Sequence, residues 1–246
     1  MSKKYFHTII SIIFISLLWS FLGGLFIVHA AEESKYVGGG YAATGQIDGI
    51  GYSCIKYDSS NGFDSLDVNY LMSDHSGYMW VGTYGGVYRY DGSEFEMMES
   101  EDGFTSGRVL YEDSKNRIWV GTNGDGVVMG DGKEIKHYSY TDGLLSSSIR
   151  SFAEGSDGYM YIGTTDGICY VDADEEFKVL NDARVNDERV LRMISGADGC
   201  VYACTKNGAI LKISEGVIAQ CYQAFDLELE SVSTIYVDKM VCLAMR

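Results

Sequence analysis

Short runs of alternating apolar and polar residues fill most of the chain, and turns rich in Gly, Asp, Asn and Ser separate them. The stretch "DHSGYMWVGTYGGVYRYDG", residues 74–92, holds two such turns and the apolar runs around them. In its first run, Tyr78 and Trp80 fall on one face of a strand, and Met79 and Val81 fall on the other. A strand that is apolar on both faces is covered on both sides. Beyond the first thirty residues, the pattern therefore predicts strands and turns, with no convincing helical periodicity.

The same order of turn, apolar run, Thr and turn recurs three more times. "DSKNRIWVGTNGDGVVMGDG" begins at Asp113, "GSDGYMYIGTTDGICYVDAD" at Gly155 and "GADGCVYACTKNGAILKISE" at Gly196. A period near forty residues, with four short strands in each unit, is typical of propeller blades. We therefore predict an all-β fold, a β-propeller of four-stranded blades with about four complete blades plus partial ones.

The first thirty residues have a different composition. Two lysines precede an apolar run from Ile9 to Val28, and small residues follow at the positions of a cleavage site. We predict a signal peptide or N-terminal membrane anchor over residues 1–30, a linker over 31–48 and the propeller over 49–246. Cleavage is favoured, but the run is long enough to hold an uncleaved chain in the membrane. In either case the propeller is expected to be extracytoplasmic.

The net charge limits the possible binding partners, and the spacing of the cysteines argues against disulfides. The formal net charge of −16 repels nucleic acid and anionic lipid surfaces, so no nucleic-acid partner is expected. The six cysteines include no C-x-x-C pair, and Cys200 and Cys204 lie too far apart along a strand for a disulfide. Small buried hydrophobic residues are therefore the favoured interpretation of the cysteines.

The repeats follow the pattern D-x-x-G-x-[IM]-[WY]-[VI]-G-T-x-x-G-[VI], with "DGF-x-S" or "DGL-x-S" after the next strand. This pattern resembles the two-component regulator propeller repeat of bacterial sensor proteins. The third copy has Tyr161 where Trp is usual, and the fourth has Ala203 and Cys204 where Val and Gly are usual. The resemblance implies an extracytoplasmic ligand-sensing domain of a receptor whose output is a histidine kinase or a diguanylate cyclase. The sequence holds no catalytic motif for either output, so we expect no enzyme activity and no cofactor.

Both ends of the repeat region are irregular. "SVSTIYVD" near the C-terminus resembles the first strand of a fifth blade, but "KMVCLAMR" follows it instead of a second strand of the usual pattern. "GYSCIKYD" at the other end resembles the outer strand of a blade. These features predict a propeller that is incomplete at the C-terminus, with the output domain missing downstream of residue 246. An unpaired blade end exposes strand edges, which favours a homodimer.

A ligand site is expected where the turns between second and third strands meet the links between blades, because both loop sets share one face of a propeller. The ligand-binding candidates are Tyr84, Arg108, Asn123, Asp125, Arg150, Thr165, Asp166, Lys206 and Asn207. Such amide, hydroxyl, aromatic and charged groups suit a small polar ligand or an oligosaccharide. The alternative is ordinary turn chemistry, because Asn, Asp, Ser and Gly populate the loops of any β protein.

Other chemistries are less well supported. Asp74, Asp113 and Asp157 recur in turns without the dense carboxylate spacing of a calcium site, so we predict no metal. His75 and His137 have no Cys or His neighbour at ligand spacing, and no catalytic residues are predicted. Two functions stay open: a receptor's sensor domain, or a secreted propeller that binds carbohydrate or acts on polysaccharide by itself.

Overall fold

The computed structural model describes residues 55–237 and 242–245, with side chains over 55–236. The chain divides into two compact units, residues 1–60 and residues 61–246. The predicted leader and linker lie outside the described residues. Within the described ranges, no helix is long and apolar enough to cross a membrane.

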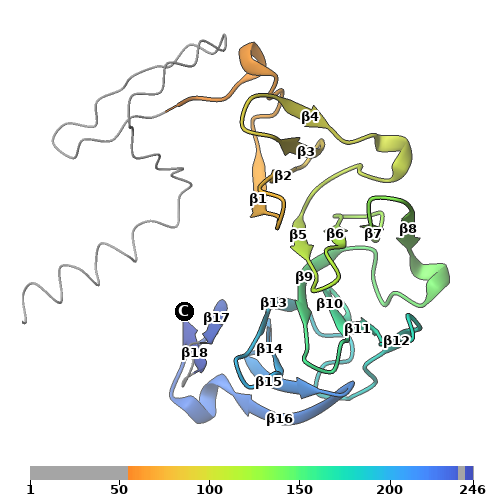
Figure 1. Ribbon diagram of the computed structural model, residues 1–246. Coiled ribbons are helices and arrows are strands. Elements are labelled where there is room, and N and C mark those ends of the chain that lie inside the picture. The colour runs from red at the N-terminus through yellow and green to blue at the C-terminus, as the bar shows by residue number, and fades with distance from the viewer. Residues whose placement is uncertain (1–54, 238–241, 246) are drawn as a thin grey trace, which may run out of the picture. The chain divides into compact units, whose positions relative to one another are not determined.

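The predicted four-stranded blades are confirmed as four antiparallel sheets with sequential strand order (Figure 1). Blade 1 consists of β1 (Val68–Ser73), β2 (Met79–Thr83), β3 (Gly86–Tyr90) and β4 (Phe95–Met97). Blade 2 consists of β5 (Val109–Glu112), β6 (Ile118–Gly121), β7 (Val127–Gly130) and β8 (Ile135–Tyr138). Blade 3 consists of β9 (Ile149–Glu154), β10 (Met160–Thr164), β11 (Gly167–Val171) and β12 (Phe177–Val179). Blade 4 consists of β13 (Val190–Ser195), β14 (Val201–Thr205), β15 (Ala209–Ser214) and β16 (Val217–Gln223).

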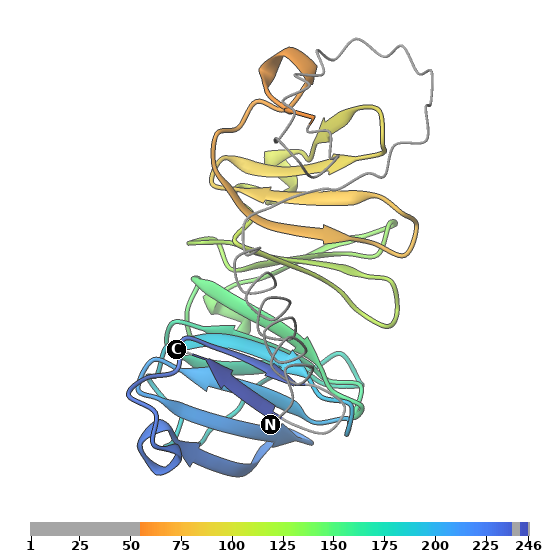
Figure 2. The same ribbon diagram turned by 90° about the vertical axis from the view of Figure 1, so that its left-hand side faces the viewer.

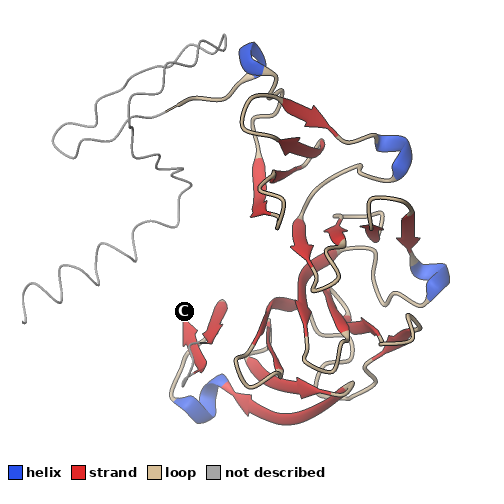
Figure 3. Ribbon diagram, viewed as in Figure 1, coloured by secondary structure: helices blue, strands red, loops and turns tan. Residues whose placement is uncertain are grey.

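Two further strands follow blade 4, β17 (Thr234–Val237) and β18 (Cys242–Met245), which pair with each other. The helices of the described residues are short 3₁₀ turns, drawn in blue in Figure 3. They are η1 (Ser59–Asn61), η2 (Ser100–Asp102), η3 (Tyr140–Asp142) and η4 (Ala224–Leu227). The fold is thus all-β, as predicted.

The expected strand at "GYSCIKYD" is not formed in its described part. Residues 55–58 are irregular and lead into η1. The Asp58 carboxylate accepts the backbone N–H of Ser60 at 2.9 Å and forms an ion pair with Lys56 at 3.1 Å. An aspartate that binds the backbone two residues ahead favours a turn over a strand, which explains the difference.

The hydrophobic core lies between successive blades, whose first strands lie side by side in the order β1, β5, β9, β13, β17. One buried cluster joins blades 1 and 2 around Trp80 and Leu110, and another joins blades 2 and 3 around Trp119 and Ile162. The largest cluster joins blades 3 and 4 and includes Tyr161. Figure 2 shows the sheets stacked against one another. The stacking explains why second strands are apolar on both faces.

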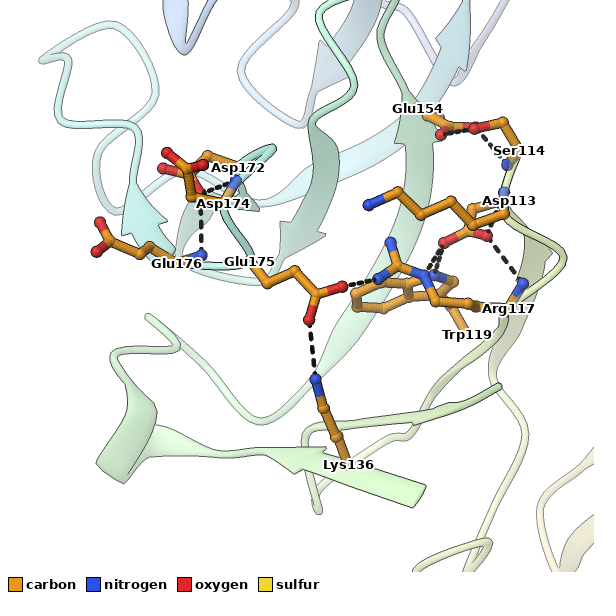
Figure 4. A network of polar contacts seen from close by, with 11 residues as sticks. Asp113, Ser114, Arg117, Trp119, Lys136, Glu154, Asp172, Asp174, Glu175 and Glu176 are labelled. Atoms are coloured by element: carbon orange, nitrogen blue, oxygen red, sulfur yellow. Dashed lines mark hydrogen bonds and ion pairs between the residues drawn. The ribbon is translucent and has the colours of Figure 1, made fainter. Parts of the chain in front are cut away.

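In blades 1 and 2, the aspartate of the D-x-x-G turn binds the tip of the core tryptophan. Trp80 Nε1 donates to Asp74 Oδ2 at 2.8 Å, and Trp119 Nε1 donates to Asp113 Oδ2 at 2.8 Å. Asp113 is buried and also forms an ion pair with Arg117 at 2.6 Å (Figure 4). These carboxylates therefore accept the indole N–H groups of the core tryptophans. Within residues 55–236, no cluster of three metal-ligating side chains is present.

In blades 3 and 4 the aspartate stands two residues later in the turn, yet it reaches the same place. Tyr161 Oη donates to Asp157 Oδ2 at 2.7 Å, and Tyr202 Oη donates to Asp198 Oδ2 at 2.9 Å. The distance along the chain from aspartate to aromatic residue falls from six positions to four when tryptophan is replaced by tyrosine. All four blades thus share the hydrogen bond from the aromatic side chain to an aspartate, although the position of that aspartate in the turn differs.

Blade 1 and the link that leads into blade 2 approach each other closely at Gly82 and Gly107. Gly107 N–H donates to the Thr83 carbonyl at 2.7 Å, across the gap between the blades. A Cβ added at Gly82 would lie 2.6 Å from the carbonyl oxygen of Gly107. Only glycine fits at this contact, because the neighbouring atoms belong to the backbone and cannot rotate away.

Candidate functional site

A buried threonine holds each turn between the second and third strands. In blades 1 to 3 its hydroxyl donates to a glycine carbonyl across the turn at 2.9 Å: Thr83 to Gly86, Thr122 to Gly126 and Thr164 to Gly167. The same hydroxyl accepts a backbone N–H from inside the turn at 2.8 to 3.2 Å. The threonine of the "GT" motif therefore fixes the loop that carries the predicted residues Tyr84, Asn123 and Thr165.

The links between blades meet these turns at the same end of the strands, as expected from the sequence. The N–H of Asn123 donates to Ser106 Oγ at 3.3 Å, and Ser148 Oγ donates to the Asn123 carbonyl at 3.0 Å. Arg150 Nη1 donates to Asn123 Oδ1 at 3.2 Å. Asn123 thus joins the link before blade 2 to the link before blade 3, and its side chain orients an arginine.

Arg150 lies in an electropositive setting. Burial lowers its pKa first, and the nearby charges of Arg108 and Arg189 lower it further, while Tyr84 acts in the opposite direction. Its Nε is shielded from solvent and has no hydrogen-bond partner in the described part of the chain. The structure therefore brings together Tyr84, Arg108, Asn123 and Arg150 from the predicted set, and adds Arg189.

Other predicted residues are engaged elsewhere. The Asp125 carboxylate accepts the hydroxyl of Thr105 at 2.6 Å, and the Thr165 hydroxyl is 2.7 Å from that of Ser146. Asp166 is exposed and contributes its N–H to the turn. These groups shape the loops, but their polar atoms are already partly used.

Lys206 and Asn207 border a separate hollow of about 280 Å³ over the link that follows blade 4. Phe225 and Leu229 line it as well. The side-chain oxygen of Asn207 also accepts the hydroxyl of Thr205, so one of its hydrogen-bonding positions is already used within its own turn. The nine predicted residues therefore divide between at least two places.

Arg189 was not among the residues predicted from the sequence. The indication was its position. Arg189 directly precedes β13, as Arg108 directly precedes β5, and the Arg189 carbonyl accepts the N–H of Lys206 at 2.8 Å.

A second hollow, of about 390 Å³, lies between blades 1 and 2 at the opposite end of the strands. Its lining includes Trp80, Phe104 and Arg89, and the ion pair between His75 and Glu112 borders it. None of the predicted ligand residues lines this hollow.

A family model described as two component regulator propeller matches three segments, residues 62–85, 106–124 and 143–166. Each segment covers part of the link before a blade, the first two strands of that blade and the start of the turn that follows them. The chain carries two-component regulator propeller repeats. The fourth blade is formed as well, although the family model does not match it.

Solved structures share the propeller fold. The extracellular domain of a hybrid two component system from B. thetaiotaomicron aligns with 22% identity and a TM-score of 0.52, over 62% of this chain and 22% of that one. Virginiamycin B lyase from Staphylococcus aureus, solved as a catalytically inactive variant with quinupristin, aligns with 13% identity and a TM-score of 0.61, over 79% of this chain and 65% of that one. PorZ of Porphyromonas gingivalis aligns with 13% identity and a TM-score of 0.58, over 75% of this chain and 32% of that one.

The chain spans about a fifth of the length of the hybrid-system domain. At these identities the likeness establishes the fold. No curated protein matches the sequence.

Proposed function

We propose that this chain is the extracytoplasmic ligand-sensing propeller of a bacterial signal-transduction receptor. The observation that carries the proposal is the family match over three repeats, together with the fold shared with an extracellular domain of a hybrid two component system. A histidine kinase or diguanylate cyclase outside these 246 residues would supply the output. The N-terminal apolar segment, if uncleaved, would hold the propeller at the membrane.

The ligand we propose is a small polar molecule or an oligosaccharide bound where the second-to-third-strand turns meet the links. Tyr84 is 56% exposed at the tip of a turn that Thr83 holds in place, so its ring is free to stack on a sugar. Asn123 and the nearby arginines supply hydrogen-bond donors and acceptors. Plain turn chemistry explains single Asn or Asp residues, but it does not explain an exposed aromatic ring beside several arginines.

Sensing would follow from the way the site is built from neighbouring blades. Asn123 binds both the link before blade 2 and the link before blade 3. A ligand that contacts these loops would favour the arrangement of blades in which they meet, and would shift the population toward it.

We expect an oligosaccharide to stabilise the full chain without being consumed. A ligand at a hundredfold excess over its Kd stabilises a protein by about 2.7 kcal/mol, which raises the Tm by about 5 to 10 °C in a domain of this size. Thermal unfolding with a panel of neutral and acidic oligosaccharides measures the shift, and chromatography of the same samples detects products. Tyr84→Ala should remove the shift.

Tyr140→Ala is the matched control, because Tyr140 is 75% exposed and lies in η3 and not in a turn between second and third strands. If Tyr84→Ala keeps the full shift, the site has been placed wrongly. Release of shortened sugars would contradict a purely sensing role.

A secreted propeller that acts on its own is the second candidate. The likeness to virginiamycin B lyase, with a TM-score of 0.61, shows that a propeller of this kind can be an enzyme. The described histidines of this chain do not favour that reading, because His75 lies in the turn at the opposite end and His137 lies in the outer strand β8. Product formation from the oligosaccharide panel would favour this alternative.

A further inference from the structure

Three arginines reach the candidate site from successive links and strands. Arg108 directly precedes β5, Arg150 is the second residue of β9, and Arg189 directly precedes β13. Strand β9 lies beside both β5 and β13, so the backbone brings the three positions to neighbouring places at the same end of the blades.

A register irregularity sets the position of Arg150. Ile149 pairs with Thr164 and Ser151 pairs with Gly163, so Arg150 between them is left out of the regular pairing. Residues at such bulges are re-aimed relative to the strand. Here the re-aimed side chain meets the Asn123 amide of the adjoining blade through Nη1.

These arginines lack acidic partners. Elsewhere Arg89 pairs with Glu96, Arg117 with Asp113, and Arg184 with Asp182. Within residues 55–236, no ion pair joins Arg108, Arg150 or Arg189 to a carboxylate, although acids outnumber bases by 35 to 19 in the whole chain.

Acidic residues are present in the same loops and leave the arginines unpaired. They are Asp125, Asp166 and Glu188. Asp125 is occupied by the hydroxyl of Thr105. Three neighbouring positive charges repel one another, and the buried Nε of Arg150 has no acceptor among the described residues. The repulsion is relieved if an anion binds between the three side chains.

On the basis of the sensing function proposed above, we infer that Arg108, Arg150 and Arg189 bind an oxyanion of the ligand, and that the ligand is an acidic oligosaccharide. The oxyanion is a sugar carboxylate or a sulfate ester, which guanidinium groups bind through paired N–H donors. Tyr84 would stack on the sugar ring that bears it or on the next ring.

Isothermal titration of the full chain tests this assignment with matched probes. The probes are trigalacturonic acid, its methyl ester, a disaccharide bearing one sulfate ester, and neutral maltotriose. We expect at least one acidic probe to bind about tenfold or more tightly than the ester and maltotriose, because a hydrogen-bonded charge pair is lost with the neutral sugars. The acid and sulfate arms identify which oxyanion is preferred. Added salt should weaken the binding.

Single variants locate the binding to the three arginines. Arg108→Gln and Arg189→Gln should each raise the Kd of the acidic probe about tenfold or more. Lys115→Gln is the control, since it removes one exposed positive charge in the turn between β5 and β6, at the other end of the strands. Arg189 is exposed, so its variant tests binding even if Arg108→Gln or Arg150→Gln lowers stability. Unchanged thermal unfolding of Arg189→Gln confirms that the fold is intact.

The assignment is overturned by any of three results: neutral sugars bind as tightly as acidic ones, the arginine variants bind like the unaltered chain, or no acidic probe binds even at about millimolar concentration. Tight neutral binding that depends on Tyr84 would leave the sensing function standing without the anion site. Binding of an acidic sugar that depends on the arginines but is accompanied by cleavage of the sugar would support the anion site and contradict the sensing function.

Discussion

At the scale of single residues, the turn aspartate and the core aromatic residue form one unit. The sequence predicts that Trp80 is a core residue, and it is buried with 7% of its surface exposed. The role of Asp74 was not predictable, because D-x-x-G is also an ordinary hairpin turn. The hydrogen bond from Trp80 crosses six residues and depends on how the turn folds back over the strand. Local spacing does not reveal such a contact.

Removal of the Asp113 carboxylate should be costly. Asp113→Ala leaves Trp119 Nε1 and Arg117 Nε without their acceptor in the buried region between blades, while Arg117 Nη1 keeps its ion pair with Glu175. We expect a loss of about 3 kcal/mol or more, because a buried pair has been broken from one side. Chemical unfolding followed by tryptophan fluorescence measures the change.

Asp131→Ala is the matched control. Asp131 also accepts two backbone N–H groups in a turn, but it is exposed. Its removal should cost about 1 kcal/mol or less. Equal losses in the two variants would mean that the tryptophan contact adds nothing to stability.

At the scale of strands and turns, periodicity alone was enough to predict the four blades. The second strands were clearest, because they are apolar on both faces. The strand expected at "GYSCIKYD" was wrong in its described part, since the Asp58 side chain competes for the backbone. The candidate site was harder to predict. The site depends on contacts between blades, such as that of Arg150 with Asn123. The sequence of either segment alone does not predict such a contact.

Gly82→Ala should disturb the joint between blades 1 and 2. The new methyl group would lie 2.6 Å from the Gly107 carbonyl oxygen, so the two backbones must move apart. We expect a loss of about 1 to 3 kcal/mol, in the range of other overpacked sites. Thermal unfolding measures it.

Gly85→Ala provides the comparison three residues away, because nothing lies within 4 Å of a Cβ added there. Its effect should be within about 0.5 kcal/mol of zero. If Gly82→Ala is equally silent, the close approach of the two glycines is not required for the blades to pack.

At the scale of the whole molecule, the acidic surplus is held in turns where backbone and side-chain donors stabilise it. Backbone N–H groups of Glu94 and Ser93 lower the pKa of Asp91 from 3.8 to about 2. Hydrogen bonding by Arg184 lowers the pKa of Asp182 to about 2, and Lys212 does the same for Asp198. Part of the negative charge is therefore stabilised by hydrogen bonds and ion pairs within the fold.

Acid should destabilise the protein between about pH 4 and pH 2. A carboxylate whose pKa is lower in the folded state stabilises the fold above its unfolded pKa, and that contribution disappears as the pH falls through the folded value. Unfolding by denaturant at pH 7, 5, 3 and 2 measures the decline. Asp198→Asn removes one such group, so the loss of stability between about pH 5 and pH 2 should be smaller in this variant.

Glu101→Gln removes an exposed acid of η2 and is the control for a simple change in net charge. The acid decline should persist in this variant. An identical flattening in both variants would point to general charge repulsion instead of hydrogen-bonded turn carboxylates.

The joints between blades use two kinds of contact. Across the first two joints, the residue after the turn aspartate donates its backbone N–H at 2.8 Å to the glutamate that ends the next blade's first strand, from His75 to Glu112 and from Ser114 to Glu154. Across the third joint, the N–H of Glu215 donates to Asp157 at 2.7 Å. Because the donor at the first two joints belongs to the backbone, the side chain after the aspartate can vary there as long as the next first strand ends in glutamate.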